Sequence, residues 1–198
     1  MAIVISADEI KKTIPGYDPK KSHLVHRQSA KIADTNYQQV LKDSTFKDVI
    51  LLSGGTASGK TEFMSEYLLN EEYIILDGTL PSFEGAKIKT REAQKRDKQV
   101  RIVAVWPADL RVAFGAFLQR DRKFPDEHFY RTHSSSRKTL LEIAESELNV
   151  TIEIYENQFE NGKLKFYKYT FDSKARMIEF IKDNQYTEDE IIDIITES

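Results

Sequence analysis

Residues 49–61 read Val49-Ile50-Leu51-Leu52-Ser53-Gly54-Gly55-Thr56-Ala57-Ser58-Gly59-Lys60-Thr61. The part from Gly54 onward matches the pattern G-x-x-x-x-G-K-[ST], in which a glycine-rich loop joins a strand to a helix. Phosphate oxygens can approach the backbone NH groups of such a loop because few bulky side chains obstruct them, and the helix N-terminus adds a partial positive charge. A glycine-rich turn that binds nothing is the alternative.

We therefore predict a nucleotide-binding loop whose last two residues contact the phosphates and the metal ion. Its members are Gly54, Gly55, Thr56, Ala57, Ser58, Gly59, Lys60 and Thr61. The Lys60 ammonium is expected to reach the β- and γ-phosphates, and the Thr61 hydroxyl is expected to bind Mg²⁺. ATP and Mg²⁺ are the cofactors that this loop implies.

Apolar and β-branched runs around the loop predict an α/β domain. The runs are mostly unbroken, which is typical of parallel strands covered on both faces. Expected strands are Ile3–Ser6, Val49–Ser53, Tyr73–Asp77 and Val100–Trp106, and expected helices are Ser22–Asp43, capped by Ser22, Lys60–Asn70 and Glu84–Lys98. Strands that alternate with helices in this way favour a parallel sheet with right-handed crossovers.

The C-terminal third has a different pattern. The β-rich segments Thr151–Asn157 and Lys163–Phe171 flank Asn161-Gly162, a dipeptide that suits a tight turn because both positions tolerate positive φ. They predict an antiparallel hairpin at a sheet edge. Two terminal helices are expected after it, one at 173–183 and one introduced by a capping box of Thr187 with Glu190.

Length, composition and charge exclude several classes of protein. The 198 residues, taken as one domain over residues 1–198, suffice for a continuous core, and the absence of cysteine excludes a disulfide scaffold and a cysteine zinc site. No apolar run approaches a membrane span and no secretory signal is visible, so no membrane association and a cytoplasmic location are expected. The net charge of −3 argues against general nucleic-acid binding.

Two carboxylates end strands of the predicted sheet. Asp8 follows the first strand, where the carboxyl ends of parallel strands gather ligands, so it can accept the proton of an attacking hydroxyl or orient that hydroxyl. A capping role for Ser6 or Asp8 is the alternative. Asp77 ends another strand and can support Mg²⁺ or contact a second substrate; a simple strand-ending turn is the alternative.

Basic residues cluster between Gln119 and Thr132. They are Arg120, Arg122, Lys123 and Arg131. Arginines on a closing segment can stabilise the charge that spreads over a migrating phosphoryl group, so this segment favours a lid over a solvated helix end. The basic run 87–101 is expected to be a solvated helix, and the four histidines lack a metal-binding spacing and are expected in surface or polar-network roles.

Taken together, these residues resemble the zeta toxin family of phosphate-loop kinases, whose members phosphorylate UDP-N-acetylglucosamine with ATP. The resemblance covers most of residues 1–171. It rests on Gly54 to Thr61, on Asp8-Glu9-Ile10-Lys11 followed by Pro15-Gly16-Tyr17, on Asp77-Gly78-Thr79, on Arg120 and Arg131, and on the hairpin around Asn161-Gly162. Only the phosphate loop is specific by itself.

The resemblance implies a role for each matching residue. Asp8 takes the place of the catalytic aspartate that activates the sugar 3′-hydroxyl. Arg120 and Arg131, with Lys60, would contact phosphates during transfer. Asp77 and Thr79 would help to hold the sugar nucleotide, although the family often has Glu where Asp77 stands. The resemblance also implies an antitoxin partner.

The order of the segments departs from the family. In the family the phosphate-loop strand comes first, whereas here the Asp8 strand precedes the loop and the Asp77 strand follows it. We interpret this as a permuted order of the first two βα units in a P-loop kinase-like sheet. Two alternatives to UDP-N-acetylglucosamine phosphorylation remain open: a kinase for another acceptor, such as an antibiotic, another nucleotide sugar or a polynucleotide end, and a nucleotide-binding regulatory module that transfers no phosphate.

Overall fold

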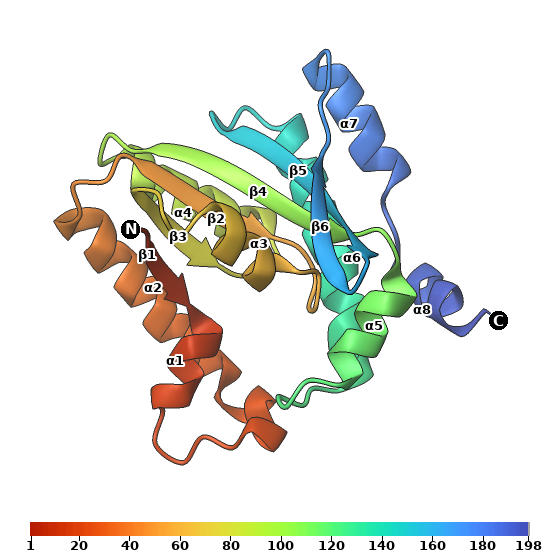
Figure 1. Ribbon diagram of the computed structural model, residues 1–198. Helices are drawn as coiled ribbons and strands as arrows, with labels where there is room; N and C mark the ends of the chain where they lie inside the picture. The colour runs from red at the N-terminus through yellow and green to blue at the C-terminus, as the bar shows by residue number, and fades with distance from the viewer. Residues whose placement is uncertain (198) are drawn as a thin grey trace.

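One six-stranded sheet organises residues 1–197, which the computed structural model describes (Figure 1). The strands lie in the order β1-β3-β2-β4-β5-β6. They are β1 (Ile3–Ser6), β2 (Asp48–Ser53), β3 (Tyr73–Asp77), β4 (Gln99–Pro107), β5 (Thr151–Glu160) and β6 (Lys163–Lys168). The first five are parallel and β6 runs antiparallel to β5, so the predicted α/β fold with a mostly parallel sheet is confirmed.

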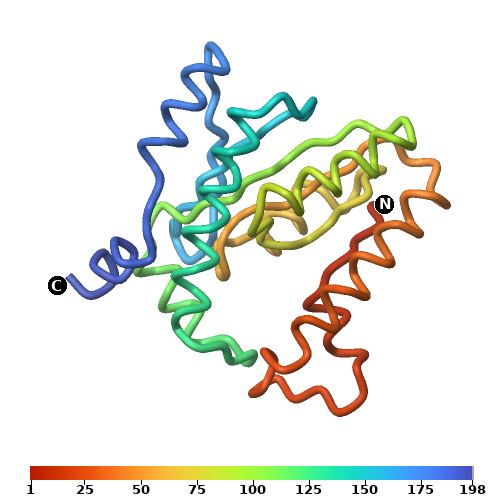
Figure 2. Tube along the Cα trace, turned by 180° about the vertical axis from the view of Figure 1, so that it is seen from behind, coloured from red at the N-terminus to blue at the C-terminus, as the bar shows by residue number. Residues whose placement is uncertain are grey.

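Helices cover the two faces of this sheet unequally. They are α1 (Ala7–Thr13), the 3₁₀ helix η1 (Pro19–Val25), α2 (His26–Asp43), α3 (Lys60–Tyr67), α4 (Phe83–Gln94), α5 (Leu110–Leu118), α6 (Asp126–Glu145), α7 (Lys174–Asp183) and α8 (Glu188–Thr196). The helices α2, α4, α6 and α7 pack on one face of the sheet, which is turned toward the viewer in Figure 2. Helix α3 packs on the other face. No helix within residues 1–197 is long and apolar enough to cross a membrane.

The strand that leads into the phosphate loop is buried on both faces. Val49 and Leu51 of β2 belong to the core beneath α2, α4 and α6, whereas Ile50 and Leu52 face α3. All four are at most 1% exposed, which explains why the sequence of β2 is an unbroken apolar run. The loop therefore begins from a strand that packing holds rigidly.

Strand register brings the predicted site residues to one edge of the sheet. Ser6 at the end of β1 pairs with Asp77 at the end of β3, and β2 runs parallel to β3 on its other side. Because the carboxyl ends of parallel strands meet at the same edge, α1 with Asp8 and the phosphate loop begin beside Asp77.

Several element boundaries differ from the sequence prediction. The helix expected from Ser22 begins at His26, because Asp18 accepts a hydrogen bond from the Lys20 amide and starts η1 instead. Helix α3 ends at Tyr67 and α4 at Gln94. The basic run beyond α4 is not a solvated helix, because the buried Lys98 donates hydrogen bonds to the carbonyls of Ser44 and Phe46 at 2.9 and 2.6 Å.

The C-terminal predictions hold in their essentials. Asn161 and Gly162 have φ of +51° and +80°, as a tight turn between β5 and β6 requires, and β6 is the edge strand. The capping box at Thr187 and Glu190 is present. Strand β6 ends at Lys168, so residues 169–171, which were predicted to belong to the strand, lie outside it.

Candidate active site

The backbone of the phosphate loop requires glycine where it turns. Gly54 and Gly59 have φ of +135° and +81°, in the left-handed region that favours glycine. A Cβ on Gly54 would lie 2.3 Å from the carbonyl oxygen of Val105 in β4, so a side chain there would displace the loop from the sheet. Gly59 directly precedes α3, whose first NH groups have no partner within the helix.

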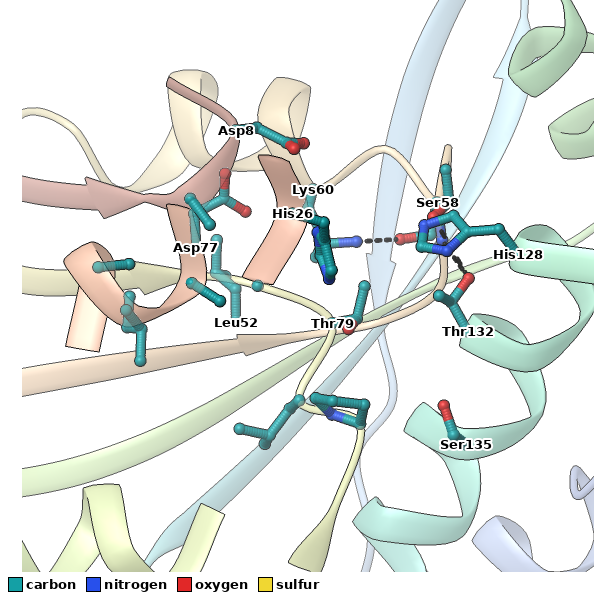
Figure 3. Close-up of a pocket in the computed structure, with 18 of the residues that line it drawn as sticks. Asp8, His26, Leu52, Ser58, Lys60, Asp77, Thr79, His128, Thr132 and Ser135 are labelled. Atoms are coloured by element: carbon teal, nitrogen blue, oxygen red, sulfur yellow. Dashed lines mark hydrogen bonds between the residues drawn. The ribbon is translucent and has the colours of Figure 1, made fainter. Parts of the chain in front are cut away.

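The Lys60 side chain folds back onto this loop. Its Nζ donates to the carbonyls of Gly54 and Gly55 at 2.7 and 2.8 Å. It also donates to the Ser58 hydroxyl at 3.2 Å (Figure 3). Burial lowers the pKa of Lys60 to about 8, while the nearby Asp77 carboxylate acts in the opposite direction. The loop thus holds its own cation at the place where the sequence predicts phosphate oxygens.

Most of the predicted site residues line one cavity of about 520 Å³. Those that line it are Asp8, Thr56, Ala57, Ser58, Lys60, Thr61, Asp77, Thr79, Arg120 and Arg131. The three loop glycines do not line it and instead shape the backbone of the turn. In Figure 3, Asp8 and Asp77 lie on one side of Lys60, and His128, Thr132 and Ser135 of α6 lie on the other.

Two cations hold the Asp8 carboxylate in the first turn of α1. Lys11 Nζ lies 2.9 Å from Oδ1, and a guanidinium nitrogen of Arg122 lies 2.6 Å from Oδ2. Burial raises the pKa of Asp8, but Lys11 and Arg122 more than offset this effect, so the net pKa lies below its ordinary value. The carboxylate is ionised and its position is fixed from two sides, as suits a group that orients a hydroxyl.

Asp77 is held in a different environment. The Ser6 hydroxyl donates a hydrogen bond to its Oδ2 at 3.0 Å. Burial raises the pKa of Asp77, while Lys60 and the Ser6 hydroxyl oppose the rise. Thr79 lies two residues further on and also lines the cavity, so both predicted substrate-binding residues face the same space.

The two predicted catalytic arginines belong to different elements. Arg120 follows α5 in an irregular segment, whereas Arg131 lies inside α6, so the expected lid does not extend over the whole basic cluster. Burial and the neighbouring Arg122 lower the pKa of Arg120. A guanidinium nitrogen of Arg131 lies 3.4 Å from Nδ1 of His128.

Aromatic residues complete the wall beside these arginines. Phe124 stacks on the His128 ring with centroids 4.2 Å apart, and the Lys11 ammonium lies 4.8 Å from the centroid of the Phe124 ring. Burial, His26 and Arg131 lower the pKa of His128 to about 4, so its ring is neutral near pH 7. Sequence analysis had given Lys11 and His128 no specific role in the site.

The comparisons with known proteins agree with this architecture. No protein-family model and no curated protein matches the chain. A solved structure of the AvrRxo1-ORF1:AvrRxo1-ORF2 complex with sulphate ions is similar over 84% of this chain and 74% of that chain, with a TM-score of 0.50 and 11% identity. A native structure of the same complex aligns over 85% and 75%, with a TM-score of 0.50 and 12% identity.

The chain shares its fold with a chain of the AvrRxo1-ORF1:AvrRxo1-ORF2 complex. A structure of the PezAT chromosomal toxin–antitoxin system of the human pathogen Streptococcus pneumoniae was also found, over 98% of this chain and 72% of that chain, with a TM-score of 0.46 and 15% identity. At such low identities the likeness describes the fold, and the function has to be argued from the site.

Three residues that sequence analysis missed hold the phosphate loop in place. Thr132 and His133 of α6 bind the backbone of Thr56, and Asn157 of β5 donates its side-chain amide to the Ser58 carbonyl at 2.6 Å. They lie 76, 77 and 99 residues from their partners, so no local pattern could have revealed them.

The oxygen atoms around the loop fit a nucleotide-bound Mg²⁺. The exposed Thr61 lies in the first turn of α3 and lines the cavity that Asp77 also lines. Mg²⁺ prefers oxygen ligands and usually combines one or two protein groups with substrate phosphates and water. Within residues 1–197 no group of three or more His, Asp or Glu side chains is placed to hold a metal.

Proposed function

We propose that this protein is an ATP-dependent phosphotransferase of the zeta toxin type, which transfers the γ-phosphate to a hydroxyl of UDP-N-acetylglucosamine or a related small molecule. One observation carries the proposal: Lys60 of the phosphate loop and the ionised Asp8 line the same cavity, together with Arg120 and Arg131. Phosphoryl transfer needs this combination of a phosphate cradle, an acceptor-side carboxylate and cations.

On the acceptor side, Asp8 orients the attacking hydroxyl. Its pKa lies below the ordinary value because Lys11 and Arg122 stabilise the ionised form. A carboxylate of this kind accepts the hydrogen bond of a hydroxyl before transfer and takes the proton as the oxygen bonds to phosphorus. Its main contribution is therefore the direction of attack, which a fixed position favours.

On the donor side, cations neutralise the charge of the migrating group. Lys60 exchanges the carbonyls of Gly54 and Gly55 for phosphate oxygens, which are stronger partners for an ammonium. Arg120 and Arg131 reach the cavity from two different elements and stabilise the equatorial oxygens. Thr61 would help to hold a nucleotide-bound Mg²⁺, which would supply further charge neutralisation.

The acceptor itself is the finer part of the proposal. Asp77 and Thr79 line the cavity beside Asp8, where they can accept and donate hydrogen bonds to a sugar nucleotide. The cavity of about 520 Å³ falls in the size range of small-molecule sites. A flat surface would instead have favoured a regulatory module.

We also propose that the first two βα units are permuted relative to the zeta toxins. The sheet order supports this because β1 with Asp8 lies beside β3, and β3 lies beside the phosphate-loop strand β2. The ends of the three strands therefore cluster although their order along the chain differs. An experimental structure superposed on a zeta toxin tests it: β1 should fall on the aspartate-bearing strand of the toxin.

A neutralising protein partner follows from the same reasoning. Two of the similar structures are complexes of AvrRxo1-ORF1 with AvrRxo1-ORF2, and the third describes a toxin–antitoxin system. A kinase that consumes UDP-N-acetylglucosamine would harm the cell that makes it. Expression of the protein alone should inhibit growth, and Asp8→Asn should relieve the inhibition; equal growth inhibition by both forms would contradict the proposal.

Incubation with ATP, Mg²⁺ and UDP-N-acetylglucosamine, followed by mass spectrometry, tests the function directly. A phosphorylated sugar nucleotide is the expected product. Asp8→Asn should abolish transfer and leave the Kd for ATP nearly unchanged, whereas Glu9→Gln, at the exposed neighbouring position, should behave like the unchanged protein. Transfer only to a different acceptor would contradict UDP-N-acetylglucosamine as the substrate. ATP binding without any transfer would favour the regulatory module.

A further inference from the structure

Two consecutive residues of α6 bind both backbone groups of one phosphate-loop residue. The Thr56 amide donates to the Thr132 hydroxyl at 3.0 Å, and His133 Nε2 lies 2.9 Å from the Thr56 carbonyl oxygen. All three residues are buried. Because a carbonyl oxygen can only accept, Nε2 must carry the hydrogen in this contact.

Packing makes the same contact rigid. A Cβ on Gly55 would lie 2.3 Å from two atoms of the His133 ring, so the ring occupies the space that any other residue at position 55 would need. The Phe129 ring also lies against His133, with centroids 4.2 Å apart. Burial lowers the pKa of His133 to about 3, so the ring binds as a neutral imidazole.

Arg131 directly precedes this pair in the chain and lines the cavity. A rotation or a slide of α6 would move Arg131 and would also break both bonds to Thr56. The helix and the loop therefore move as one unit, whereas Arg120 lies in an irregular segment outside any helix. The two arginines differ in how firmly the fold fixes them relative to the phosphate loop.

We propose that Thr132 and His133 are positioning residues that hold Arg131 in fixed register with the phosphate loop. The proposal rests on the proposed function, since it assigns Arg131 to the phosphates of the nucleotide. Misplacement of a phosphate-binding group by about 1 Å can cost on the order of 100-fold in rate. Loss of the contacts that fix Arg131 should therefore lower the rate of transfer measurably.

A pair of substitutions at His133 separates its hydrogen bond from its bulk. The amide of His133→Gln can place an NH group near the position of Nε2, whereas His133→Leu fills space without a donor. His133→Leu should lower kcat by about tenfold or more, and His133→Gln should recover most of the loss. Thr139→Val, at another buried position of α6, is the control and should leave kcat unchanged.

A double-mutant cycle tests whether the effect passes through Arg131. Once Arg131→Ala has removed the guanidinium, His133→Leu should cost less than it does in the unchanged protein, because only its effect on the phosphate loop itself then remains. If the fold losses in kcat of His133→Leu and Arg131→Ala simply multiply in the double variant, the proposal is wrong. If the protein binds ATP without transferring phosphate, the proposed function is wrong. The positioning proposal is then tested by measuring the Kd for ATP in the same four proteins of the double-mutant cycle.

Nuclear magnetic resonance of the ¹⁵N-labelled histidines gives a readout that needs no activity. His133 should show a protonated Nε2 and an unprotonated Nδ1 from pH 5 to pH 8. A His133 ring that titrates near its ordinary pKa, or that carries its hydrogen on Nδ1, would contradict the proposed role of His133 even in an active enzyme.

Discussion

A guanidinium nitrogen of Arg122 lies 2.6 Å from Oδ2 of Asp8, and this ion pair joins α1 to the segment between α5 and α6. The same segment also contacts η1, where the Lys123 amide donates to the Pro19 carbonyl at 3.0 Å. The acceptor-side carboxylate is thus charge-compensated from across the cavity. Its protonation depends on a residue that the resemblance to zeta toxins did not single out.

Replacement of Arg122 by glutamine should move the acidic limb of the pH–rate profile to higher pH. The pKa of Asp8 lies below its ordinary value with Lys11 and Arg122 beside it, and activity is lost as the pH falls through that pKa. Loss of one cation raises the pKa, so protonation begins at a higher pH. The profile of kcat/KM between pH 3 and 8 measures the shift.

Lys123→Gln is the matched control for this charge change. Its ammonium binds the Leu118 carbonyl instead of Asp8, so the acidic limb should stay in place. An unchanged limb in Arg122→Gln, or an equal shift in both variants, would show that the ion pair does not set the protonation of Asp8.

Gly55→Ala should destabilise the protein by about 1–3 kcal/mol, because the new methyl group collides with the His133 ring. Removal of the ring in the double variant with His133→Ala should recover part of this loss. Urea unfolding of the two single variants and the double variant measures the coupling. Gly115→Ala in α5 has open space around its Cβ and should be neutral or stabilising; similar losses at both glycines would contradict the steric explanation.

Gly162→Ala tests backbone strain without a steric contact. Its Cβ would meet nothing within 4 Å, but φ is +80°. A residue with a side chain adopts this region at a cost of about 1–2 kcal/mol, so the free energy of unfolding should fall by that amount. Val in place of Ala should cost at least as much. A stability equal to that of the unchanged protein would mean that the turn adopts another conformation.

Asn157→Asp should weaken ATP binding by about tenfold at pH 7, because a carboxylate would face the Ser58 carbonyl that the amide now binds at 2.6 Å. Burial raises the pKa of such a carboxyl group, and its protonated form can donate a hydrogen bond. Affinity should therefore recover as the pH falls toward 5, which calorimetric titration can follow. Affinity that stays low at every pH would assign the effect to packing.

The strands and the phosphate loop were predictable because local sequence determines them. Tyr73–Asp77 is a strand with the predicted limits, since its apolar run is buried on both faces. The capping box at Thr187 likewise depends only on a residue three positions away. These signals lie within a few neighbouring residues.

Helix α6 and the contacts around the cavity were not predictable in the same way. Its inner face includes the polar residues Thr132, His133, Ser136 and Thr139, so its apolar period is obscured. Those polar side chains are buried because the phosphate loop and the neighbouring helices surround them. The partners of Asp8 and of Thr56 come from distant parts of the chain and meet only after the sheet has formed.

The position of β1 gives the two halves of the cavity unequal resistance to local opening. β1 is an edge strand with β3 as its single neighbour, whereas β2 lies between β3 and β4. Amide hydrogens of β1 should exchange with solvent deuterium faster than those of β2, since fraying of an edge strand breaks fewer contacts. In the proposed function, the half of the cavity that contains Asp8 would then open to the acceptor while β2 and the phosphate loop stay folded.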